Sequence, residues 1–274
     1  MKVGHPSEAL AKPYSLSDAQ IDAFKRDGFI KLRGVFDAET LGHYGDDITK
    51  LTLVHDKYKD VPLEQRSTYA KAFIQVTNLW RMSERAREFS FAPRVARIAA
   101  ELLEVSGVRM WHDQALYKEA GGGFTPWHVD QQYWPMSSDR CVTAWIPLQA
   151  VAMNMGPLSF GIGSHNVDIA RTMEISDESE RYIQDAVARL QIAECFEPYE
   201  LGEVSFHLGW TLHRAGPNTS QWPRRVHTVI YMDENMRLAT EMTANQRVDW
   251  EAFSPSTKPG EVMRDELNPV LWSR

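Results

Sequence analysis

Two residues able to do metal or acid–base chemistry stand close together in this sequence, His128 and Asp130, within the stretch FTPWHVDQQYWP. Residues two apart in a β-strand point to the same face, so this imidazole and this carboxylate would converge on one point. That point could be a metal ion, a hydrogen bond, or nothing of functional importance. The pattern His-x-Asp alone is a weak signal, because three-residue patterns recur by chance.

A second stretch, TLHRAGPNTSQWPRRVHTVIYM, strengthens the signal. In it His213 closes an apolar, strand-like run, a turn follows, and Arg224 and Arg225 begin the next expected strand. Two histidines and one carboxylate on a β scaffold would form a facial triad, which leaves three coordination positions open and suits iron(II) that handles oxygen. Such an iron needs a source of electrons, commonly 2-oxoglutarate. The distal carboxylate of 2-oxoglutarate needs a buried cation, which the planar fork of arginine supplies best.

The first third of the chain is predicted to be mainly helical and to support these residues from outside. The stretch SLSDAQIDAFKRDG predicts a helix that Ser15 or Ser17 caps and that Gly28 ends, and FIKLRGVF predicts a short strand after it. DAETLGHYGDDITKL and APRVARIAAELLE predict two further helices, the second with a proline near its first turn and an apolar stripe.

From about Val108 the sequence changes to short apolar, β-branched or aromatic runs separated by glycine, proline and asparagine. Many short strands with turn signals between them indicate a β-sandwich or barrel. A helical insertion, SDESERYIQDAVARLQ, with Ser176 as its cap, interrupts the strands. We therefore predict one domain over residues 1–274, with a helical part over about 1–107, a β core over about 108–235 and a wrapping C-terminal tail.

Composition narrows the possible partners. The formal net charge of −7 disfavours nucleic acid and anionic membrane surfaces, since both are bound by basic patches. No run of about 18 apolar residues predicts a transmembrane helix, and the amino terminus lacks the apolar core of a secretory signal. The two cysteines, Cys141 and Cys195, form no CxxC pair, so neither a disulfide framework nor a thiolate zinc site is expected, and the predicted location is the cytoplasm.

Several motifs extend the two stretches into a family pattern. They are LYKEAGGGFTPWHVDQQYWP, TAWIPLQ on the next expected strand, MGPLSFGIGSH in place of N-G-x-L-x-x-x-P-G-S-H, and LHRAGPN at the distal histidine. In this order they resemble the phytanoyl-CoA dioxygenase family of iron(II)- and 2-oxoglutarate-dependent oxygenases, over about Trp111 to Met232. The resemblance implies a mainly β fold whose core is a double-stranded β-helix, or jelly roll, with flanking α-helices.

Carried over from the family's motifs, the resemblance implies that His128, Asp130 and His213 are the catalytic residues and the iron ligands. The family's arginine lies eleven residues beyond its distal histidine, which selects Arg224 over Arg225. The implied cofactor is iron(II), and 2-oxoglutarate and molecular oxygen are the implied cosubstrates.

Three more residues match positions near the cosubstrate in the family. Trp145 matches an aromatic residue that lines the cosubstrate site, Thr143 shares its face two residues earlier, and Gln114 stands where relatives often place a polar contact. Two positions depart from the pattern. Ala215 replaces a frequent serine, which puts one hydrogen bond to the cosubstrate in doubt, and Ile162 replaces the proline of the P-G-S-H turn.

The implied reaction is hydroxylation of an unactivated C–H bond of a small molecule, with release of succinate and carbon dioxide. A relative with the same cofactor could instead catalyse epimerisation, desaturation or ring closure. Halogenation is disfavoured, because family halogenases lose the carboxylate that Asp130 supplies here. A non-catalytic jelly roll that binds a metal or a ligand is a more remote alternative, which Arg224 beside a full ligand set disfavours.

Bulky residues after the His-x-Asp motif favour a substantial, partly apolar small-molecule substrate, such as a secondary metabolite. If strand alternation continues past Asp130, Gln132 and Trp134 face the metal side, whereas Gln131 and Tyr133 face away. We therefore expect Gln132 to be a polar substrate contact and Trp134 to be an apolar wall.

Three other histidines are expected to serve the structure rather than the chemistry. His165 is expected to organise a loop, and His207 and His227 to face the core or solvent. The sequence leaves open the identity of the substrate, the choice between a free acid and a thioester, and the oligomeric state.

Overall fold

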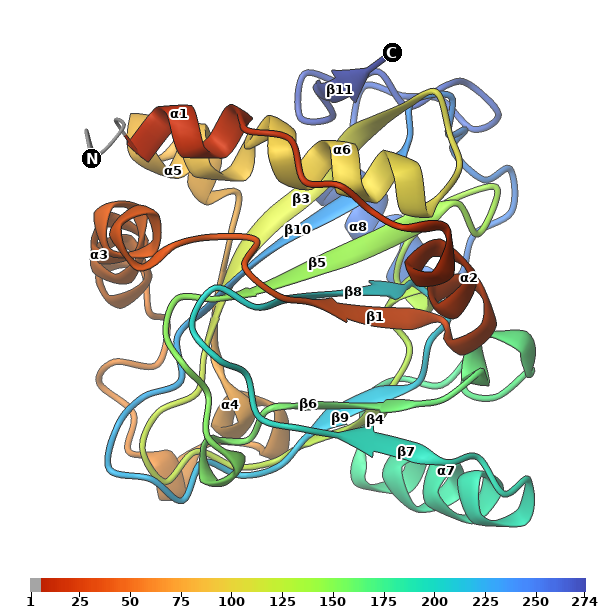
Figure 1. The fold of residues 1–274 in the computed structure, drawn as a ribbon. Coiled ribbons are helices and arrows are strands. Elements are labelled where there is room, and N and C mark those ends of the chain that lie inside the picture. Colours follow the sequence, from red (N-terminus) through yellow and green to blue (C-terminus); the bar gives the residue numbers. More distant parts are fainter. Residues whose placement is uncertain (1–5) are drawn as a thin grey trace.

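Two antiparallel β-sheets face each other in the middle of the molecule, and helices cover the outer side of the larger sheet (Figure 1). The structure is a computed structural model that describes residues 6–274, so residues 1–5 of the expected helical part lie outside the described residues. The chain passes repeatedly from one sheet to the other. This arrangement is the jelly roll with flanking helices that the sequence predicts.

The larger sheet contains seven strands among the described residues. They are β1 (Phe29–Leu32), β2 (Ile74–Thr77), β3 (Gly107–Tyr117), β5 (Cys141–Pro147), β8 (Val204–Leu208), β10 (Val226–Asp233) and β11 (Val270–Ser273). Their order is β1-β8-β5-β10-β3-β11, and β2 also pairs with β3. The long strands β3 and β10, together with β5, form the centre of this sheet.

The smaller sheet is formed by β4 (Thr125–His128), β6 (Leu158–Gly161), β7 (Glu194–Phe196) and β9 (His213–Ala215). Their order is β4-β9-β6-β7, with antiparallel pairing throughout. Because β4 and β9 are neighbours, segments that are far apart in the sequence meet at the positions of the expected metal ligands.

Most helices precede the jelly roll. They are α1 (Pro6–Ala11), α2 (Asp18–Asp27), α3 (Ala38–Val54), α4 (Thr68–Ala72), α5 (Glu84–Ser90) and α6 (Pro93–Leu102), followed later by α7 (Asp177–Arg189) and α8 (Ala244–Phe253). The predicted caps are confirmed, because Ser17 accepts a hydrogen bond at the start of α2, Gly28 ends it with φ of 82°, and Ser176 caps α7. Short 3-10 turns lie at Leu63–Gln65, Leu79–Arg81, Asp130–Gln132, Met153–Met155 and Ser164–Asn166.

Alternation along the central strands separates a structural face from a chemical face. On β5, Val142, Ala144 and Ile146 pack with the helices in the main hydrophobic core. Thr143 and Trp145, between them, face the cavity that lies between the sheets. Helices α3 and α6 contact the outer face of this sheet. The apolar half of each strand therefore anchors the sheet, and the other half is left for function.

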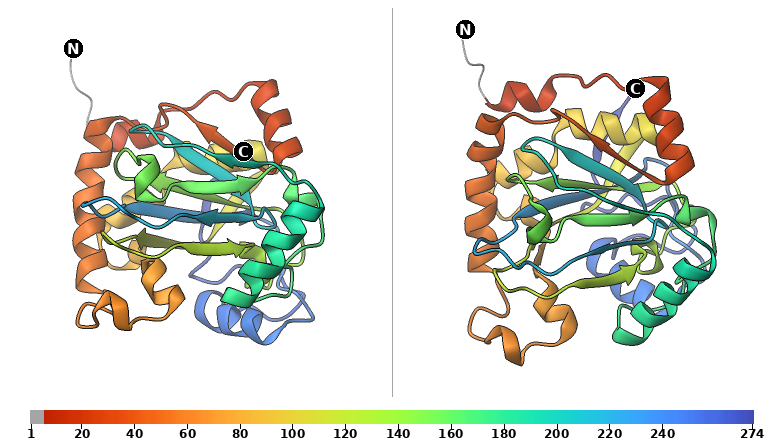
Figure 2. Two further views of the ribbon diagram at one scale, coloured as in Figure 1. Left: turned by 90° about the horizontal axis from the view of Figure 1, so that it is seen from below. Right: turned by 60° about the horizontal axis from the view of Figure 1, so that its bottom comes forward.

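The C-terminal segment contains two elements that the sequence analysis did not predict, α8 and β11. The start of α8 carries a signal that could have revealed it, a capping box in which Thr243 and Gln246 each accept a hydrogen bond from the other's backbone N–H. In both views of Figure 2, α7 and α8 lie at the same end of the jelly roll. Asn245 of α8 donates a hydrogen bond to Glu174, just before α7, at 2.9 Å.

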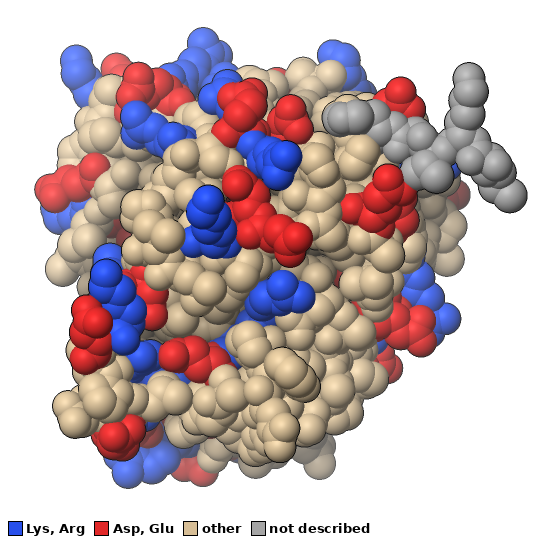
Figure 3. Space-filling model, turned by 90° about the vertical axis from the view of Figure 1, so that its left-hand side faces the viewer, with Lys and Arg blue, Asp and Glu red and all other residues tan. Residues whose placement is uncertain are grey.

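The surface and the helices add two observations on partners. None of the helices within residues 6–274 is long and apolar enough to cross a membrane. On the face shown in Figure 3, basic and acidic side chains are interspersed rather than gathered by sign. That face therefore offers no extended basic surface of the kind that nucleic acid binds.

Candidate active site

His128 and His213 lie opposite each other where β4 pairs with β9. His213 begins β9, so the expectation that it closes a strand is wrong. The ring centroids are 4.1 Å apart. Each Nδ1 donates to the backbone carbonyl two residues earlier, that of Pro126 at 2.8 Å and that of Thr211 at 3.0 Å. Because a carbonyl can only accept, these bonds fix the proton on Nδ1 and leave both Nε2 atoms available to a metal.

The Asp130 carboxylate reaches the two rings from a turn rather than from a strand. β4 ends at His128, and Asp130–Gln132 form a 3-10 turn, so the expected continuation of the strand is wrong. Asp130 Oδ1 lies 3.6 Å from Nε2 of His128 and 3.5 Å from Nε2 of His213. The potential ligand atoms of the three residues all lie within 4.8 Å of one another. The three side chains thus have the arrangement of a facial triad.

The surroundings give these groups the protonation states that a metal needs. Burial lowers the pKa of His128 and of His213 to about 4, so both imidazoles are neutral at pH 7. For Asp130, burial raises the pKa, but His213 and then His207 together lower it more, so the carboxylate is ionised. Two neutral imidazoles and one carboxylate are the donor set of non-haem iron(II) oxygenases, so the residues present fit iron(II).

Two donors hold the second oxygen of Asp130. Oδ2 accepts from Thr143 Oγ1 at 3.1 Å and from His207 Nε2 at 3.3 Å. His207 is buried, and its ring centroid lies 4.4 Å from that of His213. The expectation that His207 faces the core or solvent is therefore wrong. With Oδ2 occupied, Oδ1 is the oxygen directed to the two histidine Nε2 atoms.

The strand pairing explains the position of His207. His207 lies opposite Thr143, and Ser205 lies opposite Trp145, where β8 pairs with β5. Phe206, between them, packs in the main hydrophobic core. The stretch GEVSFHLG thus alternates between an apolar face and a polar face, and this alternation, matched to that of β5, is the signal that could have identified His207.

His165 and His227, which were expected to serve the structure, lie outside the cavity lining. His165 Nε2 lies 3.1 Å from the carbonyl oxygen of Lys25, in the loop after β6. His227 is fully buried, and its Nε2 lies 2.9 Å from the hydroxyl of Ser90 on α5. Both contacts connect the jelly roll to the helices.

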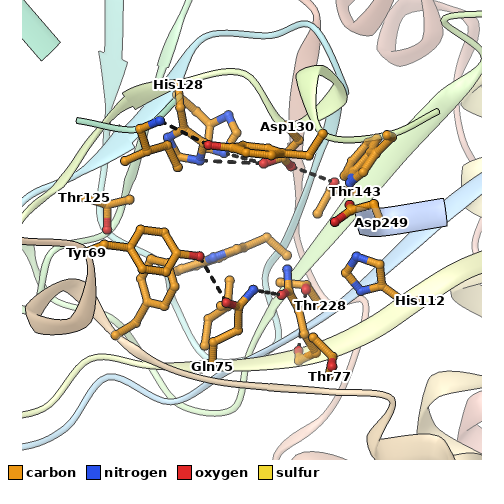
Figure 4. A pocket seen from close by; sticks show the side chains of 18 of the residues that line it. Tyr69, Gln75, Thr77, His112, Thr125, His128, Asp130, Thr143, Thr228 and Asp249 are labelled. Atoms are coloured by element: carbon orange, nitrogen blue, oxygen red, sulfur yellow. Dashed lines mark hydrogen bonds and ion pairs between the residues drawn. The ribbon is translucent and has the colours of Figure 1, made fainter. Parts of the chain in front are cut away.

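The triad opens into a cavity of about 460 Å³ between the two sheets (Figure 4). In that view His128 and Asp130 lie on one side, with Gln75 and Thr228 across from them. Further lining residues are Lys57, Tyr69, Phe73, Thr77, His112, Gln114, Thr125, Tyr133, Trp134, Thr143, Trp145, Ile175, His207, His213, Ala215, Arg224, Asp249 and Phe253.

Arg224 supplies a buried cation to this cavity. Its Nη1 donates to the carbonyl of Gly156 at 2.5 Å, and its guanidinium lies 5.3 Å from the ring centre of Trp145. Its Nε is buried without a hydrogen-bond partner, and it forms no ion pair with a carboxylate of residues 6–274. Burial lowers the pKa of Arg224 to about 10, so it stays charged at pH 7. An unpaired buried charge is costly, so this end of the cavity fits an anion.

Lys118 lies beside Arg224 but does not add a second fixed charge. The two residues form a backbone bridge. Burial, and then the charge of Arg224, lower the pKa of Lys118 to about 6, so the amine is mainly neutral at pH 7. Its Nζ donates to the carbonyl of Gly123 and lies 3.4 Å from Thr125 Oγ1. Lys118 therefore holds the glycine run at residues 121–123, which precedes the triad, by a side-chain hydrogen bond.

Arg225 occupies a different place from its neighbour. Its Nε donates to Gln149 Oε1 at 2.7 Å, and it does not line the cavity. Of the two arginines that the sequence places side by side, Arg224 is the one in the cavity.

The three other cosubstrate candidates, Trp145, Thr143 and Gln114, also line the cavity. Gln114 Oε1 accepts from Gln75 Nε2 at 2.6 Å, so a residue of β2 that the sequence did not single out orients it. Ala215, at the position where the family often has serine, lines the cavity with a methyl group and offers no side-chain hydrogen bond.

Of the two residues expected to contact substrate, Trp134 lines the cavity and Gln132 does not. Gln132 is buried, and its Nε2 has no hydrogen-bond partner among the described residues. The 3-10 turn rotates the chain differently from a strand, so Tyr133, expected to face away, also lines the cavity. The Tyr133 hydroxyl accepts from the backbone N–H of Ile175 at 3.1 Å.

Comparison with known proteins agrees with this geometry. Residues 24–226 match the model of the family described as phytanoyl-CoA dioxygenase (PhyH). A curated relative, the probable alpha-ketoglutarate-dependent hypophosphite dioxygenase of Stutzerimonas stutzeri, is 26% identical over 133 residues. That match covers 45% of each chain, so it spans less than half of the relative.

Several solved structures have the same fold. The epimerase SnoN from nogalamycin biosynthesis, in complex with Fe3+, alpha ketoglutarate and nogalamycin RO, has a TM-score of 0.75 at 22% identity, over 93% of this chain and 98% of that one. The carbocyclase SnoK from the same biosynthesis has a TM-score of 0.74 at 21% identity, over 95% and 99%. EctD from S. alaskensis, with 2-oxoglutarate and 5-hydroxyectoine, has a TM-score of 0.70 at 22% identity, over 92% and 87%.

The geometry of the triad predicts a graded loss of metal binding. Asp130→Ala should abolish turnover and weaken iron(II) binding the most, because it removes the only charged ligand atom of the triad. His207→Phe should weaken it by about ten- to a hundred-fold, since it leaves the ligand but removes one donor that orients it. Titration of each variant with iron(II) under anaerobic conditions measures both effects. Asp139→Ala, which removes an exposed acid nearby, is the control; near-normal iron binding by Asp130→Ala would contradict the ligand assignment.

The two adjacent arginines should differ in their effect on 2-oxoglutarate. A charge-assisted hydrogen bond contributes about 1.5–3 kcal/mol, so Arg224→Met should weaken 2-oxoglutarate binding by at least about ten-fold. Arg225→Met should change it far less, because that side chain lies outside the cavity lining. Calorimetric titration of 2-oxoglutarate into both metal-loaded variants gives the comparison, and the reverse ranking would move the assignment to Arg225.

Proposed function

Because the chain belongs to the phytanoyl-CoA dioxygenase family of iron(II)- and 2-oxoglutarate-dependent oxygenases, we propose that it hydroxylates an unactivated C–H bond of a small, partly apolar molecule, with release of succinate and carbon dioxide. It is a dioxygenase of the oxidoreductase class, whose cofactor is iron(II) and whose cosubstrates are 2-oxoglutarate and molecular oxygen. The supporting observation is Arg224, a buried cation in the same cavity as the triad that has no anionic partner among residues 6–274. A protein that only binds a metal has no need of such an arginine, which disfavours the non-catalytic alternative.

When bound, iron(II) and 2-oxoglutarate supply the activation of oxygen, and the protein orients the reactants and excludes water from them. His128, Asp130 and His213 would hold the metal from one side and leave the cavity side open. Arg224 would hold the distal carboxylate of 2-oxoglutarate, and the ring of Trp145 would pack against the guanidinium as it does here. Every one of these side chains is held by a partner of its own before any ligand arrives, so little rearrangement is needed on binding.

The wall of the cavity supports a partly apolar substrate. Tyr69, Phe73, Tyr133, Trp134 and Phe253 all contribute aromatic surface to it. Large apolar side chains exclude water from the reacting atoms, and they favour a ligand with matching apolar surface, such as a secondary metabolite. A small molecule is accordingly the proposed partner, and the cytoplasm stays the predicted location.

The same cofactor could serve a different outcome. The structural neighbours include an epimerase and a carbocyclase as well as a protein solved with a hydroxylated product. In such enzymes the position of the substrate relative to the metal decides which bond forms. Epimerisation, desaturation and ring closure therefore remain alternatives to hydroxylation, and they share the predicted ligand set.

A turnover assay tests the proposal. Protein loaded with iron(II) should convert 2-oxoglutarate to succinate and carbon dioxide only when oxygen is present, and a true substrate should accelerate this conversion. The mass of the product separates the alternatives, because hydroxylation adds one oxygen atom, desaturation and ring closure remove two hydrogen atoms, and epimerisation changes neither. If iron and 2-oxoglutarate bind but no succinate forms with any candidate substrate, the result favours the alternative of a non-catalytic jelly roll over the proposed enzyme.

Trp134 provides a test of the cavity wall. Trp134→Ala should leave iron and 2-oxoglutarate binding nearly intact, because the side chain is proposed to orient the substrate without holding either. Misplacement by about 1 Å can cost on the order of a hundred-fold in rate, so product formation should fall while succinate continues to form. Trp222→Ala, at an indole that is 71% exposed and outside the cavity, is the control. A normal ratio of product to succinate in Trp134→Ala would assign the residue to packing alone.

A further inference from the structure

One face of α8 forms part of the cavity wall. Val248, Asp249, Ala252 and Phe253 line the cavity, and their spacing places them on one side of the helix. The ring of Phe253 stacks on that of His112 of β3, with the centroids 4.3 Å apart and the planes inclined by 23°. This stacking fixes α8 against the larger sheet. Figure 4 shows Asp249 and His112 at the same end of the cavity.

Asp249 has no partner for its charge in the part of the chain that the structure describes. Asp249 is half-buried in the cavity wall, and among residues 6–274 it forms neither a hydrogen bond nor an ion pair. Burial raises the pKa of Asp249 to about 7, and no neighbouring cation offsets this. Glu251, two residues further along the same helix, is exposed and does not line the cavity. Asp249 thus places a carboxylate in the cavity wall, whereas Glu251 on another side of the same helix is solvated.

The same cavity encloses both Asp249 and the triad. The pKa of Tyr69 and the pKa of Tyr133 are raised first by burial and also by the charges of Asp130 and of Asp249. Both tyrosines line the same cavity as the two carboxylates.

The charges of the loaded site leave Asp249 unbalanced. The two positive charges of iron(II) and the one of Arg224 equal the two negative charges of 2-oxoglutarate and the one of Asp130. His112 is neutral at pH 7, because burial lowers its pKa to about 4. Lys57 lines the cavity but is exposed to solvent and forms no ion pair with Asp249. Asp249, with a pKa of about 7, is partly ionised at pH 7 in the empty cavity, and a cation beside it would favour the ionised form.

We propose that Asp249 is a substrate-binding residue that receives a protonated amine, so that the substrates of this enzyme are small aromatic or apolar amines. This inference rests on the proposed function, since it names the class of substrate for that same cavity. The ammonium group would bind Asp249 and contact the faces of the neighbouring aromatic rings, which attract cations. The apolar remainder of the molecule would extend past Tyr69 and Tyr133 towards the metal end.

The charge distribution disfavours an anionic substrate. The buried cation of the cavity, Arg224, is needed by 2-oxoglutarate, so a second carboxylate or a phosphate near α8 would meet Asp249 without compensation. A neutral alcohol of the same shape could accept the apolar wall but would gain only an ordinary hydrogen bond at Asp249.

Tryptamine and tryptophol form a matched pair of probes, because they share the indole and chain length and differ in an ammonium against a hydroxyl. Binding of each is measured by calorimetry on protein loaded with nickel(II), which cannot support turnover, in the presence of 2-oxoglutarate. Wild-type protein should bind tryptamine at least about ten-fold more tightly than tryptophol. Asp249→Asn should lose this preference, and Asp249→Ala provides a second variant should the amide disturb α8.

Glu251→Gln is the matched control, because it removes the same charge from the same helix on the exposed side, and it should keep the preference. Equal binding of the two probes by wild-type protein, no binding of tryptamine, or a preference that survives in both Asp249 variants would each overturn the inference. The affinity of wild-type protein for 2-oxoglutarate is measured on the same samples. If 2-oxoglutarate fails to bind, the proposed function is wrong. The difference in affinity between tryptamine and tryptophol then still tests whether Asp249 binds an ammonium group.

Discussion

The candidate site depends on the way the Asp130 carboxylate is divided between two sets of contacts. One oxygen faces Nε2 of His128 and of His213, and the other accepts from Thr143 and His207. A carboxylate in a confined site is stable only if its oxygens are satisfied, so the two donors make the side chain tolerable before a metal arrives. They also select which oxygen is left to bind the metal. Without them the carboxylate could turn, and the triad would lose its geometry.

The jelly roll supplies these contacts from both of its sheets. The two histidines come from the smaller sheet, where β4 pairs with β9, whereas Thr143 and His207 are opposite each other on the larger sheet. Asp130 therefore bridges the two layers, and any change in their separation would alter its contacts. The helices outside the larger sheet pack on the alternate residues of the same strands, such as Ala144. Packing on the outer face thus holds the separation that the inner face needs.

The sequence predicted the elements that follow local rules and missed those that depend on tertiary context. Ser17 and Ser176 cap helices because capping is decided within one turn, and the motifs around His128 and His213 carry the family pattern. The turn at Asp130–Gln132 was missed because strand alternation gives no sign of where a strand ends. His207 was missed because its role follows from the register of β8 against β5, which a single strand does not reveal.

In the proposed site, metal binding and substrate choice are assigned to different kinds of element. The triad, Arg224 and Trp145 stand on strands or beside them, where the register of two sheets fixes each position, so exchange of one residue disturbs the others. Asp249 stands on α8, a helix of the tail that contacts the larger sheet through the stacking of Phe253 on His112. A side chain on this helix can change without shifting a strand. The fold can thus keep one set of metal ligands while α8 and the turn after Asp130 alter which molecules are held against them.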